Sequence, residues 1–516
     1  MKILAIINES FANMALGRNT SLAYILSSVK LGHEVYIYNL EKDLPKSRNS
    51  SVLALHLTSN IKLCQALVKN YEQRNLEIME CVEKKDLKKL HQLKIQRVSD
   101  LVCIDPILRS DENIFNIIGR NKASSLSAKL KTLSPPKLET LSPAKIETLS
   151  PRLHDGVHTQ AKTTLKLNEV NFVIQRLEPM KSPFPPAGKK DVNEILKKLK
   201  KLFPKFIFNC PINLGDKETP QKINRILKEK IATPTAEFSI DDENVLNQVK
   251  SMSAEYKKLY KKTFAKLVFK PKDSAQSLGV FAVEFCENGL DFLSLKNQEI
   301  TELHSMQLYK IKNNLNEKEL KKIIEILCYV QNFKSDKSLR ELTRAQILKN
   351  AKKLYHGKIL VQPFLEGVKS GDIRTNFLKD KKGNFYVAGS TFRKSLRLED
   401  KNFTTTYSTG GATSQPIEIL EKEEIKNLKK KIKMILDVLN GSLKEKYKNV
   451  IELGADFILV GDSKNIFLGE LNHHCQALVP VSEAMARAVD EKAKYGFGLE
   501  FTTKGLVDAM GRMNWK

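Results

Sequence analysis

The first forty residues contain two apolar runs separated by an amphipathic stretch. The apolar run at 3–7 predicts a strand, apolar residues at helical spacing over 22–29 predict a helix, and a second apolar run at 34–38 follows Gly32. A strand, a helix and a strand in this order are typical of the first unit of a parallel α/β layer. The pattern therefore predicts an α/β fold at the amino-terminal end of the chain.

Strands and helices alternate over much of the remaining chain. Short apolar runs between polar turns predict strands, and an amphipathic, lysine-rich stretch at 192–202 predicts a helix. This mixture places the chain in the α/β (α+β) class. Strands that bear on function are predicted at 171–176, 205–208, 267–269, 359–362, 385–390, 456–460 and 466–471.

One stretch, from about 121 to 166, differs in kind because Leu-Ser-Pro recurs in it with a period of eight. The copies lie at 133–135, 141–143 and 149–151. Three copies rich in Pro and Ser are too short to bury a core, so we expect a flexible insert. A tolerated surface insertion is favoured over a regulatory or docking role for the Ser-Pro pairs.

Lysine dominates the charge of the chain. There are 86 Lys and Arg residues against 59 Asp and Glu residues among 516, so the formal net charge is +27. Such a surface attracts nucleic acid, acidic membranes or anionic small molecules, and charge alone does not choose among them. Hydrophobic residues make up 41% and charged residues 28%, which argues against wholesale disorder and fits about three domains.

Cysteine usage and the amino-terminal residues indicate the compartment. The seven cysteines are scattered without a Cys-x-x-Cys pair, which favours a reducing environment over a disulfide framework and predicts no zinc site. The apolar run before Asn8 is too short for a signal sequence or a membrane span. We therefore expect a cytoplasmic protein without a membrane partner.

Three oxygen-bearing side chains lie near the carboxyl-terminal end. Glu470 and Asn472 are two residues apart and share one face of a predicted strand, and a neighbouring strand would bring Asp456 beside them. Two carboxylates and an amide oxygen suit Mg²⁺, which keeps water and substrate phosphates as its other ligands. Taken alone, these residues are better explained as ordinary polar residues at strand ends, and only the other motifs favour the metal site.

A lysine and a polar loop supply the first of those motifs. Lys270 ends an apolar strand, and the loop 272–279 separates it from a second apolar run. Backbone N–H groups of such a loop, which includes Ser277 and Gly279, can fold over a phosphate while the lysine supplies a charge. A solvated lysine at a strand end is the simpler alternative, because the loop has one glycine where phosphate loops have several.

A further set of motifs follows the strand at 359–362. An open turn after Gln362 can present backbone groups to an adenine edge, and Asp372 can accept ribose hydroxyls. Arg374 and, after another strand, Arg393 are suited to phosphate or carboxylate, because a planar guanidinium binds these groups with two hydrogen bonds. The glycine turn at 408–413 is suited to a lid or substrate loop.

The ordered set of motifs resembles the ATP-grasp ligases, and within them the bacterial glutathione synthetase family most closely. Their order and spacing carry the resemblance, since no single motif is specific. It covers about 1–45, 168–283 and 355–515 of the chain. The motifs are Arg176-x-x-Pro179, Asn209-x-Pro211, Lys270-Pro271, Gln362-x-Phe364-Leu365, Gly371-Asp372-x-Arg374, Gly410-Gly411, Gly454-x-Asp456 and Glu470-x-Asn472.

The resemblance implies an architecture for the chain. A Rossmann-like, pre-ATP-grasp domain would comprise residues 1–45 and 168–235, and an ATP-grasp domain with two antiparallel sheets would comprise residues 236–516. Residues 46–167 would form a partly disordered or extended insert that contains the Leu-Ser-Pro repeat.

The resemblance also implies roles for individual residues around an ATP bound between the two sheets. Phosphate and base contacts would come from Lys222, Lys270, Ser277, Gly279 and the strand end at Gln362, and Asp372 would bind the ribose. Mg²⁺, with Mn²⁺ as an alternative ion, would be held by Asp456, Glu470 and Asn472. Arg374 and Arg393 would be catalytic, stabilising the transferred phosphoryl group and an acyl phosphate.

The activity implied is that of an ATP-dependent ligase that joins an acid to an amino acid through an acyl phosphate. The family's own substrates are γ-glutamylcysteine and glycine, so the expected partners are ATP, an acidic peptide and an amino acid. Relatives are often dimers or tetramers, which makes a homo-oligomer the expectation. Nucleic acid is not expected as a partner on this interpretation.

One departure keeps two alternatives open. The family carries arginines on both sides of its Gly-Gly lid, whereas residues 404–414 contain none, although Arg397 is a candidate substitute. Their absence favours a second hypothesis, a ligase that adds an amino acid to another peptide, a protein tail or a different acid. A third hypothesis is a basic nucleic-acid-binding protein on a degenerate ATP-grasp scaffold, supported by the net charge of +27 and opposed by aromatic residues at only 7%.

Overall fold

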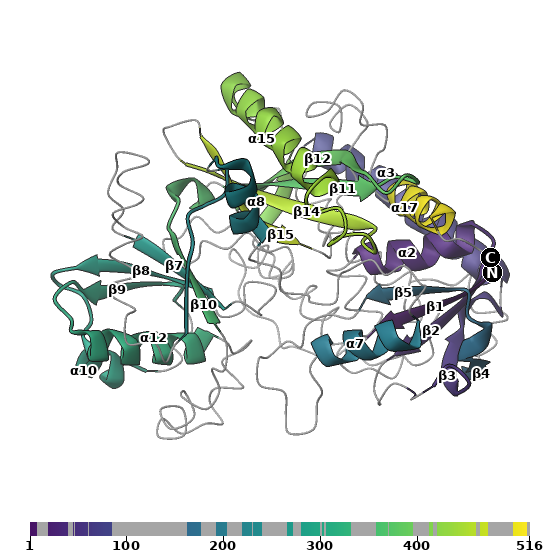
Figure 1. Cartoon of the computed structure of the whole chain (residues 1–516), viewed down its shortest axis with the longest axis horizontal. Coiled ribbons are helices and arrows are strands. Elements are labelled where there is room, and N and C mark those ends of the chain that lie inside the picture. The colour runs from purple at the N-terminus through teal and green to yellow at the C-terminus, as the bar shows by residue number, and fades with distance from the viewer. Residues whose placement is uncertain are drawn as a thin grey trace, which may run out of the picture. The chain divides into compact units, whose positions relative to one another are not determined.

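The structure is a computed structural model in which the chain divides into two compact units (Figure 1). The first unit comprises residues 1–176, 476–480 and 498–506, and the second comprises residues 177–475, 481–497 and 507–516. The structure describes residues 1–7, 19–39, 45, 47–59, 61–84, 162–176, 192–203, 219–229, 231–239, 266–271, 280–299, 302–303, 306–331, 358–369, 371–395, 412–415, 420–460, 465–472 and 499–512.

The first unit contains a five-stranded sheet in the order β4-β3-β2-β1-β5. Strand β1 is parallel to both of its neighbours, β2 and β5, as expected of a parallel α/β layer, while β3 and β4 continue the sheet in antiparallel pairs. Its elements are β1 (Lys2–Ile7), α2 (Asn19–Lys30), β2 (Glu34–Asn39), β3 (Ser51–His56), η1 (Leu57–Ser59), α3 (Ile61–Glu83), β4 (Lys162–Lys166), η5 (Leu167–Glu169), β5 (Phe172–Arg176) and the residues 499–506 of α17.

The range 46–167, expected to be an insert, contains elements of this sheet. Strand β3 pairs with β4 from Ser51↔Lys166 to Leu55↔Lys162, so the two ends of that range meet at the sheet edge beside β2. The exposed face of β3 carries the apolar Leu53, so apolar and polar residues do not alternate along this strand and the pattern missed it. The Leu-Ser-Pro repeat itself lies outside the described residues.

The second unit contains two five-stranded sheets. One has the order β6-β10-β7-β8-β9 and is antiparallel except for the parallel pair β8 and β9; the other, β13-β12-β11-β14-β15, is antiparallel throughout. The expected pair of antiparallel sheets is therefore present, with one parallel edge. The strands are β6 (Ala236–Ser239), β7 (Lys266–Pro271), β8 (Phe281–Cys286), β9 (Leu308–Lys312), β10 (Lys358–Pro363), β11 (Gly371–Lys379), β12 (Phe385–Ser395), β13 (Ala412–Gln415), β14 (Glu452–Leu459) and β15 (Ile466–Asn472).

Helices cover one face of each of these sheets (Figure 1). Helix α12 packs Ile323 and Leu327 against Phe269 and Phe281 of the first sheet, and α15 packs Leu428 and Ile435 against the second. The candidate site residues on these strands lie on the sheet faces that α12 and α15 do not cover. The helices of this unit are α7 (Val192–Leu202), α8 (Thr219–Leu227), α10 (Phe292–Asn297), α12 (Glu317–Gln331), η6 (Glu366–Lys369), α15 (Lys422–Asn440) and the end of α17 (Leu499–Gly511).

The remaining predictions from the sequence concern one strand, the lid, the cysteines and membrane spans. The strand predicted at 205–208 and most of the lid at 404–414 lie outside the described residues, although Ala412 begins strand β13. Among the described residues, Cys64, Cys286 and Cys328 are free thiols. No helix among the described residues is both long enough and apolar enough to cross a membrane.

Candidate active site

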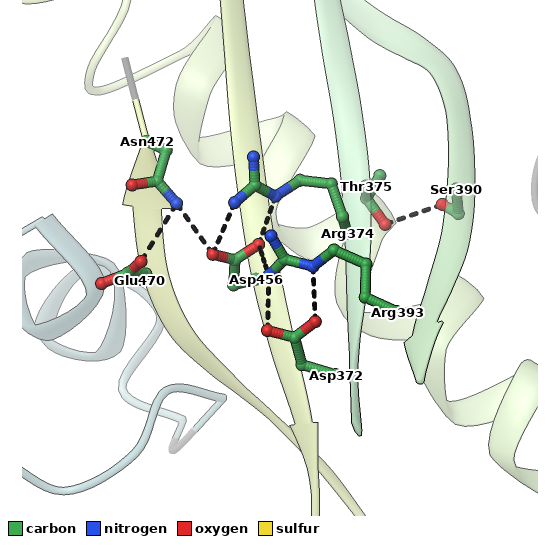
Figure 2. A network of polar contacts seen from close by, with 8 residues as sticks. All are labelled: Asp372, Arg374, Thr375, Ser390, Arg393, Asp456, Glu470 and Asn472. Carbon is green, nitrogen blue, oxygen red and sulfur yellow. Dashed lines mark hydrogen bonds and ion pairs between the residues drawn. The ribbon is translucent and has the colours of Figure 1, made fainter. Parts of the chain in front are cut away.

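A row of charged and amide side chains crosses four adjacent strands of the second sheet (Figure 2). Arg393 on β12 lies directly opposite Asp372 on β11, Arg374 lies opposite Asp456 on β14, and Asp456 lies opposite Glu470 on β15. Alternation along each strand sends the neighbouring residues to the other face. That face is the apolar one beneath α15, where Ile373, Phe392, Ala455 and Leu471 are buried.

Two bidentate ion pairs hold the row together. Arg374 donates from Nε and Nη2 to the two carboxylate oxygens of Asp456, with Nη2 2.8 Å from Oδ2. Arg393 binds Asp372 in the same manner, with Nε 2.6 Å from Oδ1, and its Nη2 also lies 2.9 Å from Asp456 Oδ1. Because all four side chains are at most 9% exposed, these pairs are only weakly screened by solvent.

The ionisation of Asp456 follows from this arrangement. Burial acts to raise the pKa of its carboxyl, but the positive charges of Arg374 and Arg393 and the hydrogen bond from Arg374 outweigh burial and hold that pKa well below its usual range. The carboxyl group is therefore a carboxylate at neutral pH, and two guanidinium groups converge on one anion.

Asn472 joins this cluster to Glu470. Its Nδ2 donates to Asp456 Oδ2 at 2.8 Å and to Glu470 Oε1 at 3.2 Å, so one amide group bridges two carboxylates (Figure 2). A register shift in the β14–β15 pairing, which passes over Gly469, gives Glu470 its position. Leu468 pairs with Phe457 in the apolar core, while Glu470 pairs with Asp456 on the opposite face.

The row also packs closely against Gly454. A Cβ atom at this position would lie 3.1 Å from Nη1 and 3.2 Å from Cδ of Arg374, so the guanidinium group lies directly over the glycine. The sequence motif Gly454-x-Asp456 therefore combines a contact surface for Arg374 with the carboxylate that binds it.

Sequence reasoning overlooked Asn376, which lies two residues beyond Arg374 and directly opposite Gly454. Asn376 is 4% exposed, and neither its Oδ1 nor Arg374 Nη1 has a hydrogen-bond partner among the described residues. Its place in the alternation, at the spacing that links Asp372 to Arg374, is the sequence signal that identifies it.

The remaining candidates lie on other elements. Lys270 and Gln362 share one face of the first sheet, because Lys270 lies opposite Leu360 and Gln362 is two residues further along β10. This face is the one opposite to α12. Lys222 is half-buried on α8, which lies against β15. Ser277 and Gly279 lie outside the described residues.

The structure thus brings together six of the eleven candidates, namely Asp372, Arg374, Arg393, Asp456, Glu470 and Asn472. It places Asp372, expected to bind ribose, in a bidentate pair with Arg393. The assignments of individual residues to ATP, metal and catalysis stay predictions.

The residue types suit the metal ion that the sequence suggested, but the orientation of Asn472 does not. Asp456 and Glu470 provide carboxylate oxygens, whereas Asn472 directs its amide nitrogen toward both of them, so its carbonyl oxygen would have to turn to join them. Mg²⁺ prefers such oxygen ligands and retains water or phosphate as the others. Among the described residues no group of three or more His, Cys, Asp or Glu side chains could hold a metal ion, so a site here is incomplete without further oxygen ligands.

The comparison with family models decides the fold family. Residues 244–494 match the model described as YheC/D-like ATP-grasp. This part of the chain is an ATP-grasp domain. The expected ATP-grasp superfamily is therefore confirmed, whereas a particular closeness to glutathione synthetases is not shown. The matched residues include the whole row of charged side chains described above.

Solved structures with a similar arrangement have low sequence identity. VanG D-Ala:D-Ser ligase from Enterococcus faecalis has a TM-score of 0.41 at 9% identity, and 99% of each chain is covered. D-cycloserine synthetase DcsG has a TM-score of 0.36 at 10% identity, covering 66% of this chain and 84% of that one. D-alanyl-alanine synthetase A from Vibrio cholerae has a TM-score of 0.34 at 12% identity, covering 68% and 78%. No curated protein matches the chain.

Proposed function

We propose that this protein is an ATP-dependent ligase that joins a carboxylate to an amine through an acyl phosphate. The observation that carries the proposal is the buried row in the ATP-grasp domain, where Arg374 and Arg393 converge beside the carboxylates of Asp456 and Glu470. Two guanidinium groups and an acidic oxygen set on one sheet face fit a transferring phosphoryl group better than a purely structural role.

The arginines supply preorganised positive charge. Phosphoryl transfer to a carboxylate brings two anions together, and the reaction needs positioning and charge neutralisation more than a covalent protein group. Arg374 and Arg393 are already fixed by bidentate pairs, so their orientation costs little further entropy when a phosphoryl group arrives. Arg374 Nη1, unpartnered among the described residues, is the donor that is free to contact it.

The other side chains bind nucleotide and ion. We assign Lys222 and Lys270 to the ATP phosphates, Gln362 to the base, and Asp456, Glu470 and Asn472 to Mg²⁺. When bound, Mg²⁺ offsets the repulsion between the substrate carboxylate and the triphosphate. Asp372 is assigned to the ribose, and through its ion pair with Arg393 it also orients that arginine.

Two pairs of substrates fit this reaction. One is γ-glutamylcysteine with glycine, which follows from the resemblance to glutathione synthetases. The other is an amino acid joined to a different peptide, a protein tail or another acid. Residues 404–414 contain no arginine that could bind the anionic ends of γ-glutamylcysteine, so we favour the second set.

Isotope exchange tests the reaction class without knowledge of the amine. ATP labelled with ¹⁸O in the β,γ-bridge is incubated with the protein, Mg²⁺ and a single carboxylic acid. Reversible formation of an acyl phosphate moves the label to a non-bridging position, which ³¹P NMR detects. A panel of acids, including γ-glutamylcysteine, identifies the acyl substrate, and phosphate release with added amines identifies the second. The proposal would be contradicted if no acid supported scrambling of the label and no pair of acid and amine supported phosphate release.

A matched pair of variants ties the activity to the site. Glu470→Gln removes one negative charge from the proposed ion site and is expected to lower phosphate release at least 100-fold. Glu287→Gln makes the same chemical change at an exposed residue between β8 and β9 and is expected to leave phosphate release unchanged. Equal rates in the two variants would refute the assignment of Glu470.

A further inference from the structure

Asn376 lies between two glycines on the sheet face that carries the row of charged residues. It is opposite Gly389 of β12 and opposite Gly454 of β14. Neither glycine has a side chain to place beside the amide. On the β14 side the guanidinium group of Arg374 occupies the space over Gly454, where a Cβ would be 3.1 Å from Nη1.

Arg374 and Asn376 each have one buried polar atom without a hydrogen-bond partner among the described residues. Nη1 of Arg374 is a donor, and Oδ1 of Asn376 is an acceptor. The other two nitrogens of Arg374 bind Asp456, and Figure 2 shows the third turned away from that carboxylate. Because a buried polar group without a partner costs free energy, both atoms indicate contacts with a bound molecule.

The order of side chains along β11 indicates which molecule Asn376 would meet. Residues two apart on a strand are separated by about 6.6 Å along it. Asp372 is assigned to the ribose and Arg374 to the transferred phosphoryl group, so Asn376 is one step further from the nucleoside. In-line transfer places the phosphoryl acceptor on the side opposite to ADP. The acyl group, and the amine that attacks it, would therefore lie beside Asn376.

Of the groups that meet at this step, the amine is the one that can donate a hydrogen bond to Asn376 Oδ1. The phosphoryl and acyl oxygens are acceptors, and they suit Arg374 Nη1 instead. We propose that Asn376 binds the attacking amine, with Oδ1 accepting one N–H hydrogen bond while the nitrogen lone pair faces the acyl carbon. The inference rests on the proposed function and adds a binding residue for its second substrate.

The step balances without another reactant. The neutral amine forms the C–N bond as the bond between the acyl carbon and the phosphate oxygen breaks. The leaving phosphate keeps the electron pair of that bond and accepts the amine proton, so acyl phosphate and amine yield amide and hydrogen phosphate. Asn376 exchanges no proton. Because it is 4% exposed, the amine loses water on binding, and Oδ1 replaces one of the lost hydrogen bonds and orients the nitrogen.

The test measures the two half-reactions separately in the full-length protein and in Asn376→Leu. Isotope exchange in ATP, with an acid that supports it, reports acyl phosphate formation without an amine. Hydroxylamine, a small probe with N–H donors, reports the attack by forming a hydroxamate. We expect Asn376→Leu to keep isotope exchange within about twofold and to raise the half-saturating hydroxylamine concentration about tenfold or more, because an apolar side chain leaves the N–H group without an acceptor.

Two further variants separate amine binding from general damage. Asn376→Asp presents an acceptor oxygen in either orientation, so its half-saturating hydroxylamine concentration is expected to stay within about threefold of the wild-type value. A rise equal to that of Asn376→Leu would contradict the need for an acceptor. Asn314→Leu makes the same change at an exposed residue between β9 and α12 and should alter neither half-reaction.

The two half-reactions also distinguish failure of this inference from failure of the proposed function. Equal losses of isotope exchange and hydroxamate formation in Asn376→Leu would overturn the inference, as would an unchanged dependence on hydroxylamine, which would assign Asn376 to water alone. Both results leave the proposed function standing. A wild-type protein that supports isotope exchange with no acid would overturn both. Asn376→Ala provides the same comparison if the leucine variant fails to fold, as judged by thermal melting.

Discussion

Asp456 and Glu470 are paired across neighbouring strands, yet their surroundings differ. Asp456 is 5% exposed and binds two arginines, whereas Glu470 is half-buried and binds the amide of Asn472. Removing one member of a buried ion pair leaves the other charge uncompensated, while a partly exposed carboxylate is readily replaced by an amide. The two residues are therefore predicted to contribute differently to stability and similarly to activity.

We expect Asp456→Asn to lower the free energy of unfolding by about 3–5 kcal/mol, because Arg374 and Arg393 lose their shared anion. Urea unfolding monitored by circular dichroism measures this. Glu470→Gln is expected to change the same free energy by less than about 1 kcal/mol. Phosphate release should be abolished by either substitution. Equal stability losses would contradict the difference in burial.

Gly454 allows a second test of the arginine's position. In Gly454→Ala the added Cβ would lie 3.1 Å from Arg374 Nη1 and would displace the guanidinium group. We expect a loss of about 10-fold or more in phosphate release, since displacing a catalytic group by a few tenths of an ångström weakens its contact in the transition state. Gly511→Ala is the control, because its Cβ would meet no atom within 4 Å.

Lys379 is the most completely buried lysine of the described residues, at 1% exposure, and predicts a pH dependence. Burial lowers its pKa to about 7, with Arg512 and Lys444 adding repulsion, although Nζ donates to Tyr447 O. In the unfolded chain, Lys379 holds this proton up to a pH near 10.5, the ordinary pKa of a lysine. Because the unfolded state binds more protons above pH 7, the stability linked to Lys379 rises as the pH increases and is lost as the pH falls through 7.

The variant Lys379→Met isolates this contribution. Between pH 7 and 9, the free energy of unfolding of the wild-type protein relative to the variant should rise by about 1.4 kcal/mol per pH unit, the value for one proton. Urea titrations at four pH values from 6 to 9 measure the difference. A difference that stays constant over this range would show that Lys379 is charged in the folded protein throughout.

Helix α8 carries Lys222, and one of the side chains that attach it is Asn224. Asn224 Oδ1 accepts from the backbone N–H groups of Ile231 and Ala232 at 2.9 and 2.8 Å, and its Nδ2 donates to Ala232 O. Ile231 and Ala232 are both fully buried. Asn224→Ala would remove this partner from the buried N–H and C=O groups of Ala232, while Ile231 N would keep its hydrogen bond to Glu229 O at 3.2 Å. We therefore expect the free energy of unfolding, measured with urea, to fall by about 2–3 kcal/mol. Arg225→Ala, one residue away on the exposed face, should cost less than about 0.5 kcal/mol.

The strands show which parts of the site can be predicted from sequence. Alternation with a period of two placed Glu470 with Asn472, and the structure confirms that both lie on one sheet face. The grouping of these two residues with Asp372, Arg374, Arg393 and Asp456 in one site followed from the family resemblance rather than from periodicity. Together these two sources identified all six residues that the structure brings into the row.

The features that sequence analysis missed depend on register. The shift at Gly469 decides whether Leu468 or Glu470 faces the core, and no local pattern specifies it. The link from Thr235 to Gln362 joins residues 127 positions apart through one hydroxyl group. Thr235 is a short polar residue in a turn sequence, where such residues are ordinary, so only its hydrogen-bond partners distinguish it. Asn376, in contrast, could have been identified from its place in the alternation of β11.

The net charge of +27 supports one alternative function, that of a nucleic-acid-binding protein on a degenerate ATP-grasp scaffold. Exposed lysines at 422, 426, 429, 430 and 433 on α15 lie on the side of the second sheet opposite to the row of charged residues. Binding of a polyanion through such lysines would weaken steeply with salt, whereas nucleotide binding in a buried site would depend on it much less. Salt dependence therefore distinguishes a surface interaction from the proposed site.

Thermal unfolding decides between these functions in the full-length protein. A ligand that binds only the folded state at 100 times its dissociation constant stabilises that state by about 2.7 kcal/mol, which corresponds to a shift of about 5 °C or more for a domain of this size. We expect MgATP to raise the melting temperature by this amount. Adding excess double-stranded DNA should not change this increase, because the row of arginines and carboxylates is buried. Glu470→Gln should reduce the shift with MgATP, since Glu470 is assigned to the ion. If DNA raised the melting temperature and MgATP did not, the nucleic-acid-binding alternative would be favoured. A degenerate scaffold that no longer binds ATP would still bind a polyanion through its surface charge.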